Sequence, residues 1–211
     1  MRRHWAFVDE SGCGDPGILA GNRLAATLGA NYGIYGPAFE LGENVPAKPG
    51  SEEYLNSEKY EIRRWDRSAS HSLAPLITQI NQIRRDNPAL HSDGSLHFHP
   101  ADNPNILCYS KSSGGNQILV AINLDPTQEQ AGWIDLDLKQ LAIPHNENFE
   151  IEDLLTGTHY HWHDRSNYVA LNPQVMPAHV FRLIRPSNGE TTLEPGAAGP
   201  TPQTPRPEAI E

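Results

Sequence analysis

The spacing of apolar residues changes along the chain and divides it into differently built parts. Between residues 71 and 86, apolar residues recur at steps of three and four, which is the period of a helix with one buried face. These positions are Leu73, Leu76, Ile77, Ile80 and Ile83. Pro75 suits the first turn of such a helix, and Pro88 ends it. The pattern therefore predicts an amphipathic helix over residues 72–86.

Beyond residue 95 the apolar period becomes two, which is typical of strands with one buried face. Seven short segments show this period, and turn-forming runs such as SSGGN separate them. The predicted strands are residues 105–111, 117–124, 132–138, 149–155, 158–163, 167–171 and 178–184. So many short strands predict an antiparallel β-sandwich over residues 91–186.

The N-terminal third is less regular. Residues 1–22 are rich in Gly and Pro and show no sustained period, whereas RLAATLGA, residues 23–30, predicts the last turns of a helix closed by Gly29. NYGIYGPAF, residues 31–39, predicts a short strand. Residues 40–70 form a long polar loop, and loops of more than about 15 residues within a compact domain are usually functional or disordered.

Composition limits the cellular compartment and the classes of partner that this chain can have. The 211 residues carry a net charge of −10, which disfavours nucleic acid as a partner because its phosphates would be repelled. No apolar run approaches the roughly 20 residues that a membrane-spanning helix needs, and the first residues lack the apolar stretch of a secretory signal. Cys13 and Cys108 are too few for a disulfide framework, and Cys108 is expected to be buried. We therefore predict a cytoplasmic protein without a membrane partner.

The C-terminal residues differ in composition from the rest of the chain. Residues 187–211 combine prolines and glycines and contain no aromatic residue. Such a segment buries too little apolar surface to offset its ordering entropy, so we predict a disordered tail.

Three alternating histidines raise the alternative of a metal site. On a strand His159, His161 and His163 would lie on one side, and imidazoles are good zinc or copper ligands. However, successive same-face residues lie about 7 Å apart, too far for three ligands of one tetrahedral ion unless the strand bends. The preferred interpretation is a solvated face, with Tyr160 and Trp162 pointing to the core.

Two other clusters could likewise be interpreted either as ligand sites or as ordinary structural residues. His97 and His99 form a weaker pair, which we also interpret as solvated. Trp133 with Asp135 and Asp137 could form a sugar-binding platform, because aromatic faces stack on pyranose rings. The preferred interpretation is that this Trp lies in the core and the aspartates lie on the solvated face.

Three segments of the chain resemble a known family. LAATLGANYGIYGPAFELGENVP, GSEEYLNSEKYEIRRWD and LAPLITQINQIRRDNPAL are similar to the C-terminal portion of the bacterial maltosyltransferases, which belong to the α-amylase superfamily, glycoside hydrolase family 13. The resemblance runs from about Leu24 to Arg185, and GSEEYLNSEKY is its most specific part. It implies the transfer of maltose from maltose 1-phosphate to the non-reducing end of α-1,4-glucans, as part of α-glucan synthesis.

The resemblance also implies an α+β fold. Residues 23–90 would be a remnant of a catalytic (β/α)8 barrel, with its last strand, a substrate loop over residues 42–70 and its last helix. Residues 91–186 would be the β-sandwich domain that follows the barrel in relatives. Residues 1–22 match nothing in the family.

One substrate contact follows from the resemblance. The Lys-Tyr pair of SEKY lies at the sugar-phosphate site of the family, so Lys59 and Tyr60 are expected to bind maltose 1-phosphate. A lysine offers a compact positive charge to a phosphate dianion, and a tyrosine offers a hydroxyl or a ring. Ser57 and Glu58 would order the loop. From the residues alone, a solvated lysine and a packed tyrosine are the alternative.

The catalytic carboxylates of the family are expected to be absent. Retaining transfer uses two carboxyl groups about 5 Å apart, and the family places its acids on barrel strands that precede Leu24. None of the loop acids is expected to be a nucleophile: Glu40, Glu43, Glu52, Glu53 and Asp66. We therefore expect a C-terminal fragment that is inactive alone, without catalytic residue, metal or cofactor. The alternative is a non-catalytic α-glucan-binding β-sandwich module. The family is homodimeric, and the state of this chain stays open.

Overall fold

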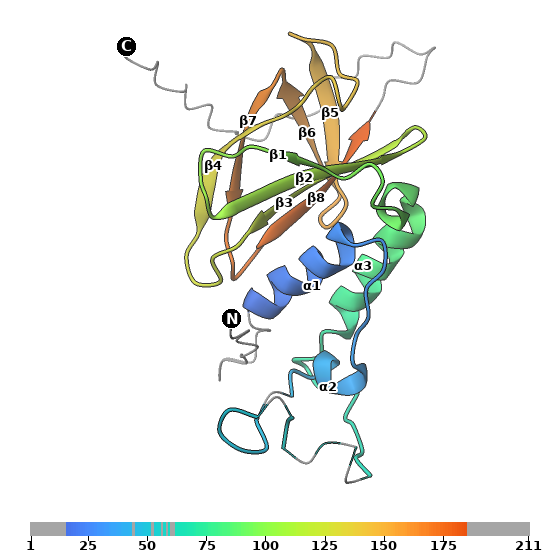
Figure 1. Ribbon diagram of the computed structural model, residues 1–211, viewed down its shortest axis with the longest axis vertical. Helices are drawn as coiled ribbons and strands as arrows, with labels where there is room; N and C mark the ends of the chain where they lie inside the picture. Colours follow the sequence, from blue (N-terminus) through green and yellow to red (C-terminus); the bar gives the residue numbers. More distant parts are fainter. Residues whose placement is uncertain are drawn as a thin grey trace.

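The computed structural model describes residues 16–43, 45–51, 53–55, 57, 59 and 62–184, with side chains from Ala20 onward. Most of this part is an antiparallel β-structure of two packed sheets, and two helices lie along one side of it (Figure 1). The predicted antiparallel sheet architecture is confirmed.

The strands form a large and a small sheet. The six-stranded sheet has the order β1-β2-β3-β8-β5-β6, and β4 pairs with β7 in a two-stranded sheet. The strands are β1 His97–His99, β2 Ile106–Ser113, β3 Asn116–Asn123, β4 Gln130–Asp135, β5 Asn148–Asp153, β6 Thr158–His163, β7 Ser166–Leu171 and β8 Ala178–Ile184. Each predicted strand is present to within a few residues. Only β1 was not predicted, because three residues are too few to show a period.

The helices agree with the prediction except at one end. The predicted helix over residues 72–86 is α3, Ala74–Asp86, with Pro75 in its first turn. It is followed by the short 3-10 helix η1, Pro88–His91. α1, Pro16–Leu28, ends before Gly29 as expected, but it begins within residues 1–22, where no regular structure was predicted.

The first core lies between the two sheets. The large sheet contributes its inward residues, among them Cys108, Leu119 and Phe181, and the small sheet contributes Ile134 and Leu171. Burial raises the pKa of the Cys108 thiol well above its usual value, so this cysteine is an unreactive core residue as predicted.

The second core lies between the large sheet and the helices. The outer face of this sheet contributes apolar residues such as Tyr109, Ile118 and Val120, and α3 contributes the buried Ile80 and Ile83. The apolar face of α3 is thus buried in this core together with residues of α1 and η1, as the helical period predicted. This packing fixes α1 and α3 against the β-structure (Figure 1).

The prediction of a strand over residues 31–39 is wrong. Residues 31–35 have no regular structure, and α2, Gly36–Glu40, follows them. A strand requires neighbouring strands for its backbone hydrogen bonds, and within the described residues none pairs with this segment. Gly36 instead takes a positive φ of 49°, and Pro37 begins a helical turn in which Leu41 N donates to Pro37 O over 2.9 Å. The described residues therefore do not form a barrel unit by themselves.

Some predictions concern residues that the structure does not describe. Cys13 and the predicted tail over residues 187–211 lie outside the described part. Among the residues that are described, no helix has both the length and the apolar character required to cross a membrane.

Candidate functional site

The long loop between α2 and α3 extends away from the sandwich (Figure 1). Its two ends are held together at the start of α3, where Leu73 N donates to Glu40 O over 2.8 Å. Ser72 Oγ also donates to Glu40 Oε1 over 3.1 Å. The loop is therefore closed at its base.

A short antiparallel turn forms the first half of the loop. Pro46 and Tyr54 face each other in an isolated bridge, and Ala47 N donates to Glu53 O over 2.7 Å. Gly50 sits at the tip with φ of 78°, a conformation that side-chain-bearing residues rarely adopt. This turn places Glu53 opposite Ala47.

The structure places Lys59 on the surface of this loop. Lys59 Nζ lies 3.4 Å from Glu53 Oε1, and the Lys59 side chain is 64% exposed. An exposed ion pair contributes only about 0–1 kcal/mol, so it does not commit the ammonium group to this contact. Tyr60 and Glu58 lie outside the described residues, so the structure does not test the Lys59–Tyr60 pair. Ser57 is buried, and its hydroxyl has no hydrogen-bond partner among the described residues.

Arg63 is a residue that the sequence analysis missed. Its guanidinium lies 4.3 Å from the centre of the Trp65 ring, and its Nη2 donates to Glu43 Oε1 over 3.2 Å. It thereby ties the second half of the loop to its first residues. The sequence contains an indication of the Arg63–Trp65 contact, because residues two apart on an extended chain lie on the same side.

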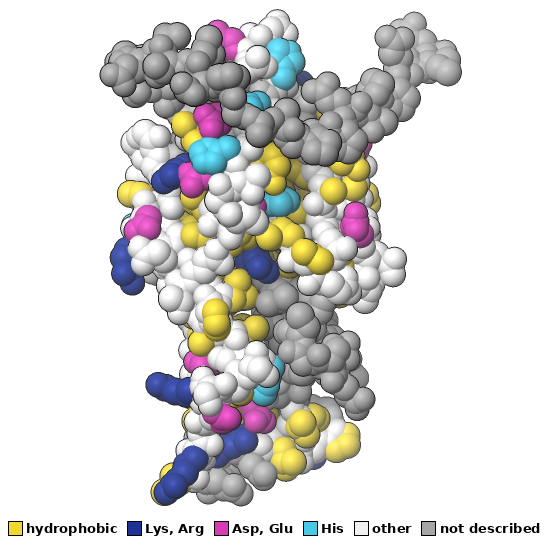
Figure 2. Space-filling view, turned by 180° about the vertical axis from the view of Figure 1, so that it is seen from behind, with side chains coloured by type: hydrophobic (Ala, Val, Ile, Leu, Met, Phe, Trp, Pro, Cys, Tyr) yellow, Lys and Arg dark blue, Asp and Glu magenta, His cyan; other side chains and the backbone are white. Residues whose placement is uncertain are grey.

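Acidic residues of the loop serve as local acceptors. Glu40, Glu43 and Glu53 contact Ser72, Arg63 and Lys59 respectively. Ser68 donates to Asp66 Oδ1 through its hydroxyl and its backbone N–H, and these bonds lower the pKa of Asp66. Figure 2 shows this mixture of charged and apolar side chains over the lower part of the molecule. Glu52 lies outside the described residues.

The alternating histidines lie on the solvated side of β6, in agreement with the preferred interpretation of the sequence. His159 Nδ1 lies 2.6 Å from Glu150 Oε1, and His163 Nδ1 lies 3.0 Å from Asn148 Oδ1, while Trp162 packs in the first core. Within the described part of the chain, no group of three or more His, Cys, Asp or Glu residues is placed to hold a metal ion. The geometry therefore gives no support to the metal alternative.

The interpretation of His99 as solvated is wrong. Its side chain is only 4% exposed. Its Nε2 lies 2.8 Å from Ser110 Oγ, and its Nδ1 accepts a hydrogen bond of 3.1 Å from Asp137 N. Because both ring nitrogens have partners, the neutral ring can be buried. Burial lowers the pKa of His99 to about 4, and the nearby charge of His97 adds to this shift.

The expected core position of Trp133 also differs from the structure. The next residue, Ile134, is fully buried between the sheets, so Trp133 lies on the opposite side of β4. There it faces Tyr168 of β7, with the ring centres 5.6 Å apart and the rings inclined by 65°. Asp135 shares this face, whereas Asp137 follows the strand and lies near His97.

Known proteins similar to this chain are maltosyltransferases. Residues 98–183 match a family model described as "GLGE, C-terminal". The chain is 48% identical over 169 residues to α-1,4-glucan:maltose-1-phosphate maltosyltransferase 1 of Streptomyces coelicolor, covering 78% of this chain and 25% of that protein. It is 45% identical over 172 residues to the α-1,4-glucan:maltose-1-phosphate maltosyltransferase of Chlorobaculum tepidum, covering 78% and 26%. The chain thus spans about a quarter of the length of the curated relatives it matches.

Solved structures with a similar fold are enzymes of the α-amylase type. An α-amylase from Geobacillus thermoleovorans complexed with acarbose superposes with a TM-score of 0.55 at 16% identity, covering 81% of this chain and 33% of that one. The cyclomaltodextrin glucanotransferase CldA gives a TM-score of 0.56 at 16% identity, covering 80% and 32%. At these identities the likeness concerns the fold alone.

Proposed function

Because the chain belongs to the C-terminal part of the α-1,4-glucan:maltose-1-phosphate maltosyltransferase family, we propose that it supplies part of the substrate site and the β-sandwich domain of such an enzyme. The enzyme would transfer maltose from maltose 1-phosphate to the non-reducing end of α-1,4-glucans. The observation that carries this proposal is the identity of 48% over 169 residues to a curated maltosyltransferase.

Within this proposal, residues 23–90 belong to the catalytic barrel and residues 91–186 to the sandwich domain. Residues 31–35 would form the last barrel strand when neighbouring strands supply backbone partners, and α3 would be the last barrel helix. The loop between α2 and α3 would then lie at the C-terminal end of the barrel strands, where active sites of this fold are found. Its closed base between Glu40 and Leu73 supports a loop of defined course.

Lys59 and Tyr60 are the proposed contacts to maltose 1-phosphate. The exposed ammonium of Lys59 is held near Glu53 by a weak pair, and a phosphate dianion would compete effectively for it. Arg63 stabilises the loop through its hydrogen bond to Glu43 and its cation–π contact with the Trp65 ring. Tyr60 enters the proposal through the family resemblance alone.

Lys59→Ala tests the proposed substrate contact. The suitable protein is a chimera in which residues 24–184 replace the matching C-terminal quarter of the Streptomyces coelicolor relative, with the catalytic barrel otherwise complete. Losing one charge-assisted contact of about 1.5–3 kcal/mol should raise KM for maltose 1-phosphate by about 10- to 100-fold. Steady-state phosphate release at varied maltose 1-phosphate measures this change.

Lys48→Ala is the matched control, because Lys48 is an exposed lysine of the same loop. It should leave KM within about twofold, as surface substitutions usually change little. If both variants behave alike in an active chimera, Lys59 is not a substrate contact. If the chimera folds but transfers no maltose, the assignment of the loop to this site fails.

We infer that the chain by itself does not perform transfer. Retaining transfer needs two carboxyl groups about 5 Å apart on a rigid frame. The described loop acids, by contrast, lie on one segment of the chain and contact serine, arginine and lysine side chains. Their role in this proposal is to shape the loop.

A second candidate function is that of an α-glucan-binding β-sandwich module without chemistry of its own. One observation favours it: the aromatic pair Trp133–Tyr168 lies on the outer side of the small sheet rather than in the core. Retardation in a glycogen-containing gel tests this function, and unretarded migration would argue against it.

A further inference from the structure

The outer face of the two-stranded sheet presents aromatic rings to solvent. In the register of β4 and β7, every second pair of residues shares this side. We call these residues the outer β4–β7 face: Ala131, Trp133, Asp135, Ser166, Tyr168 and Ala170. The alternate residues, such as Ile134 and Val169, point into the first core, so the aromatic pair is not needed to fill it.

The rings of this face remain accessible. Tyr168 is 43% exposed and Trp133 is half-buried. Their neighbours along the strands are Ala131 and Ala170, whose methyl groups are too short to cover the rings. The two rings meet edge to face, an arrangement that stabilises aromatic pairs and keeps both rings in place without burying them.

The backbone beneath Trp133 is held rigidly. Trp133 N donates to Asp102 Oδ1 over 2.8 Å, and Asp102 N donates to Trp133 O over 3.0 Å. Gly132 makes this approach feasible, since a Cβ there would lie 2.5 Å from Asp102 Oδ1. A ligand that stacks on Trp133 therefore meets a ring that is already positioned, which lowers the entropy cost of binding.

Polar groups line one side of the rings. Ser166 Oγ donates to Asp135 Oδ1, and Arg165 Nη2 lies 3.6 Å from Asp135 Oδ2. The face thus combines apolar rings with a carboxylate, a guanidinium and a phenol hydroxyl. The aromatic surface can supply contact area to a polar ligand, and the polar groups can fix its orientation.

This combination fits a neutral sugar chain better than other ligands. A glucose ring has an apolar C–H face that stacks on aromatic rings, and its rim of hydroxyls matches donors and acceptors such as Arg165 and Asp135. Anionic polymers are disfavoured by Asp135 and by the net charge of −10. A second copy of the chain is disfavoured because two rings offer far less than the roughly 800 Å² per partner of a stable interface.

The inclination of the rings selects among sugar chains. Rings inclined by 65° cannot both lie flat on a straight ribbon such as a β-1,4-glucan, whereas an α-1,4-glucan curves from one glucose unit to the next. We propose that the outer β4–β7 face binds an α-1,4-glucan chain, with Trp133 and Tyr168 each stacking on a glucose unit. This proposal rests on the proposed function for the choice of α-glucan, and it adds a site separate from the loop of Lys59.

The test uses the full chain and two oligosaccharides. Maltoheptaose titrated into the protein should give saturable calorimetric binding and a change in tryptophan fluorescence, and cellohexaose should give neither. Trp133→Ala and Tyr168→Ala should each weaken maltoheptaose binding at least tenfold and remove the retardation in glycogen gels. Phe98→Ala is the matched control, because Phe98 is a 51% exposed aromatic residue on β1, outside this face. It should bind as the unaltered chain does.

Several results would overturn the proposal. These are no binding of maltoheptaose by the unaltered chain, equal binding of cellohexaose, or undiminished binding by both aromatic variants. Circular dichroism and a thermal melt verify that the variants are folded. Asp135→Asn, a nearly isosteric change, is a further variant that should weaken maltoheptaose binding severalfold. Failure of maltosyl transfer in the chimera would contradict the role of the loop and would leave these binding results unaffected.

Discussion

At the scale of single residues, His99 shows how the fold can bury a group that the sequence presents as solvated. Its ring is enclosed between Ser110 and the backbone of Asp137, and each ring nitrogen has one partner. This arrangement accommodates the neutral imidazole. The protonated form would lose solvation and would lie beside His97, with ring centres 5.0 Å apart.

The pKa of His99 predicts a loss of stability in mild acid. The folded protein holds this pKa near 4, whereas an unfolded chain titrates near its ordinary value of about 6.5. As the pH falls through this window, the unfolded state takes up a proton that the folded state does not, so the free energy of unfolding decreases. Between pH 7.5 and 4.5 the decrease due to His99 should be about 2–3 kcal/mol, and above pH 7.5 the effect is absent.

Urea unfolding of the original chain and of His99→Gln at both pH values measures this effect. The glutamine amide can retain polar contacts but does not titrate, so the variant should lose about 2–3 kcal/mol less than the original chain over the same interval. Equal losses would show that His99 is not a buried neutral ring.

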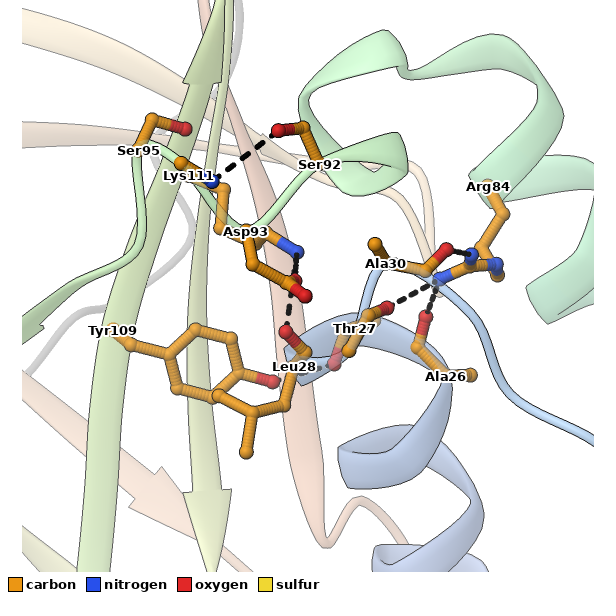
Figure 3. Close-up of polar contacts among 12 residues, drawn as sticks. Ala26, Thr27, Leu28, Ala30, Arg84, Ser92, Asp93, Ser95, Tyr109 and Lys111 are labelled. Atoms are coloured by element: carbon orange, nitrogen blue, oxygen red, sulfur yellow. Dashed lines mark hydrogen bonds and ion pairs between the residues drawn. The ribbon is translucent and has the colours of Figure 1, made fainter.

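At the scale of elements, the C-terminal end of α1 is stabilised by cations from other parts of the chain (Figure 3). The last turn of α1 has no basic residue, although its final carbonyl groups lack partners within the helix. Arg84 of α3 donates to the carbonyls of Ala26 and Ala30, the second over 2.6 Å. Lys111 of β2 donates to Leu28 O over 3.1 Å. These contacts join α1 to both α3 and the sheet.

Arg84→Met should loosen this junction. The change leaves carbonyl groups at the end of α1 without donors, and such a loss costs about 1–3 kcal/mol of stability. Hydrogen exchange should accelerate at residues 26–32 more than in the strands, and the urea midpoint should fall. Arg85→Met is the control, because Arg85 is the exposed neighbour on the same helix and should change stability by less than about 0.5 kcal/mol. Similar effects of both changes would argue against the capping role.

At the scale of the whole molecule, the described chain consists of a packed β-structure and a projecting loop region (Figure 1). Large apolar side chains are exposed in and beside the loop, including Tyr35, Val45 and a fully exposed Ile62. Exposed apolar groups gathered in one region are typical of surfaces that contact other protein segments. This agrees with the proposal that the loop completes its site only beside a catalytic barrel.

The chain alone should therefore release no phosphate from maltose 1-phosphate. Incubation with maltose 1-phosphate and glycogen should give phosphate at the rate of a protein-free blank, while a full-length relative under the same conditions turns over. The physical reason is that retaining transfer requires two carboxyl groups about 5 Å apart on a rigid frame, whereas the described loop acids contact serine, arginine and lysine side chains. Turnover comparable to the relative would refute the inference that this segment is inactive by itself.

The sequence by itself determined the elements whose patterns are local. The period of α3, the alternation in seven strands, and the solvated side of β6 follow from how side chains project from a helix or a strand, so the local sequence predicts them. The family resemblance can also be recognised from the sequence alone, because its most specific part is the contiguous run GSEEYLNSEKY.

Only the tertiary structure decided what depends on partners distant in sequence. It set the strand order, replaced the expected strand over residues 31–39 by an irregular segment and α2, and buried His99. It also turned Trp133 outward beside Tyr168 and brought Arg84 to the end of α1. Each of these outcomes is determined by hydrogen bonds or packing between segments far apart along the chain, which local periodicity does not encode.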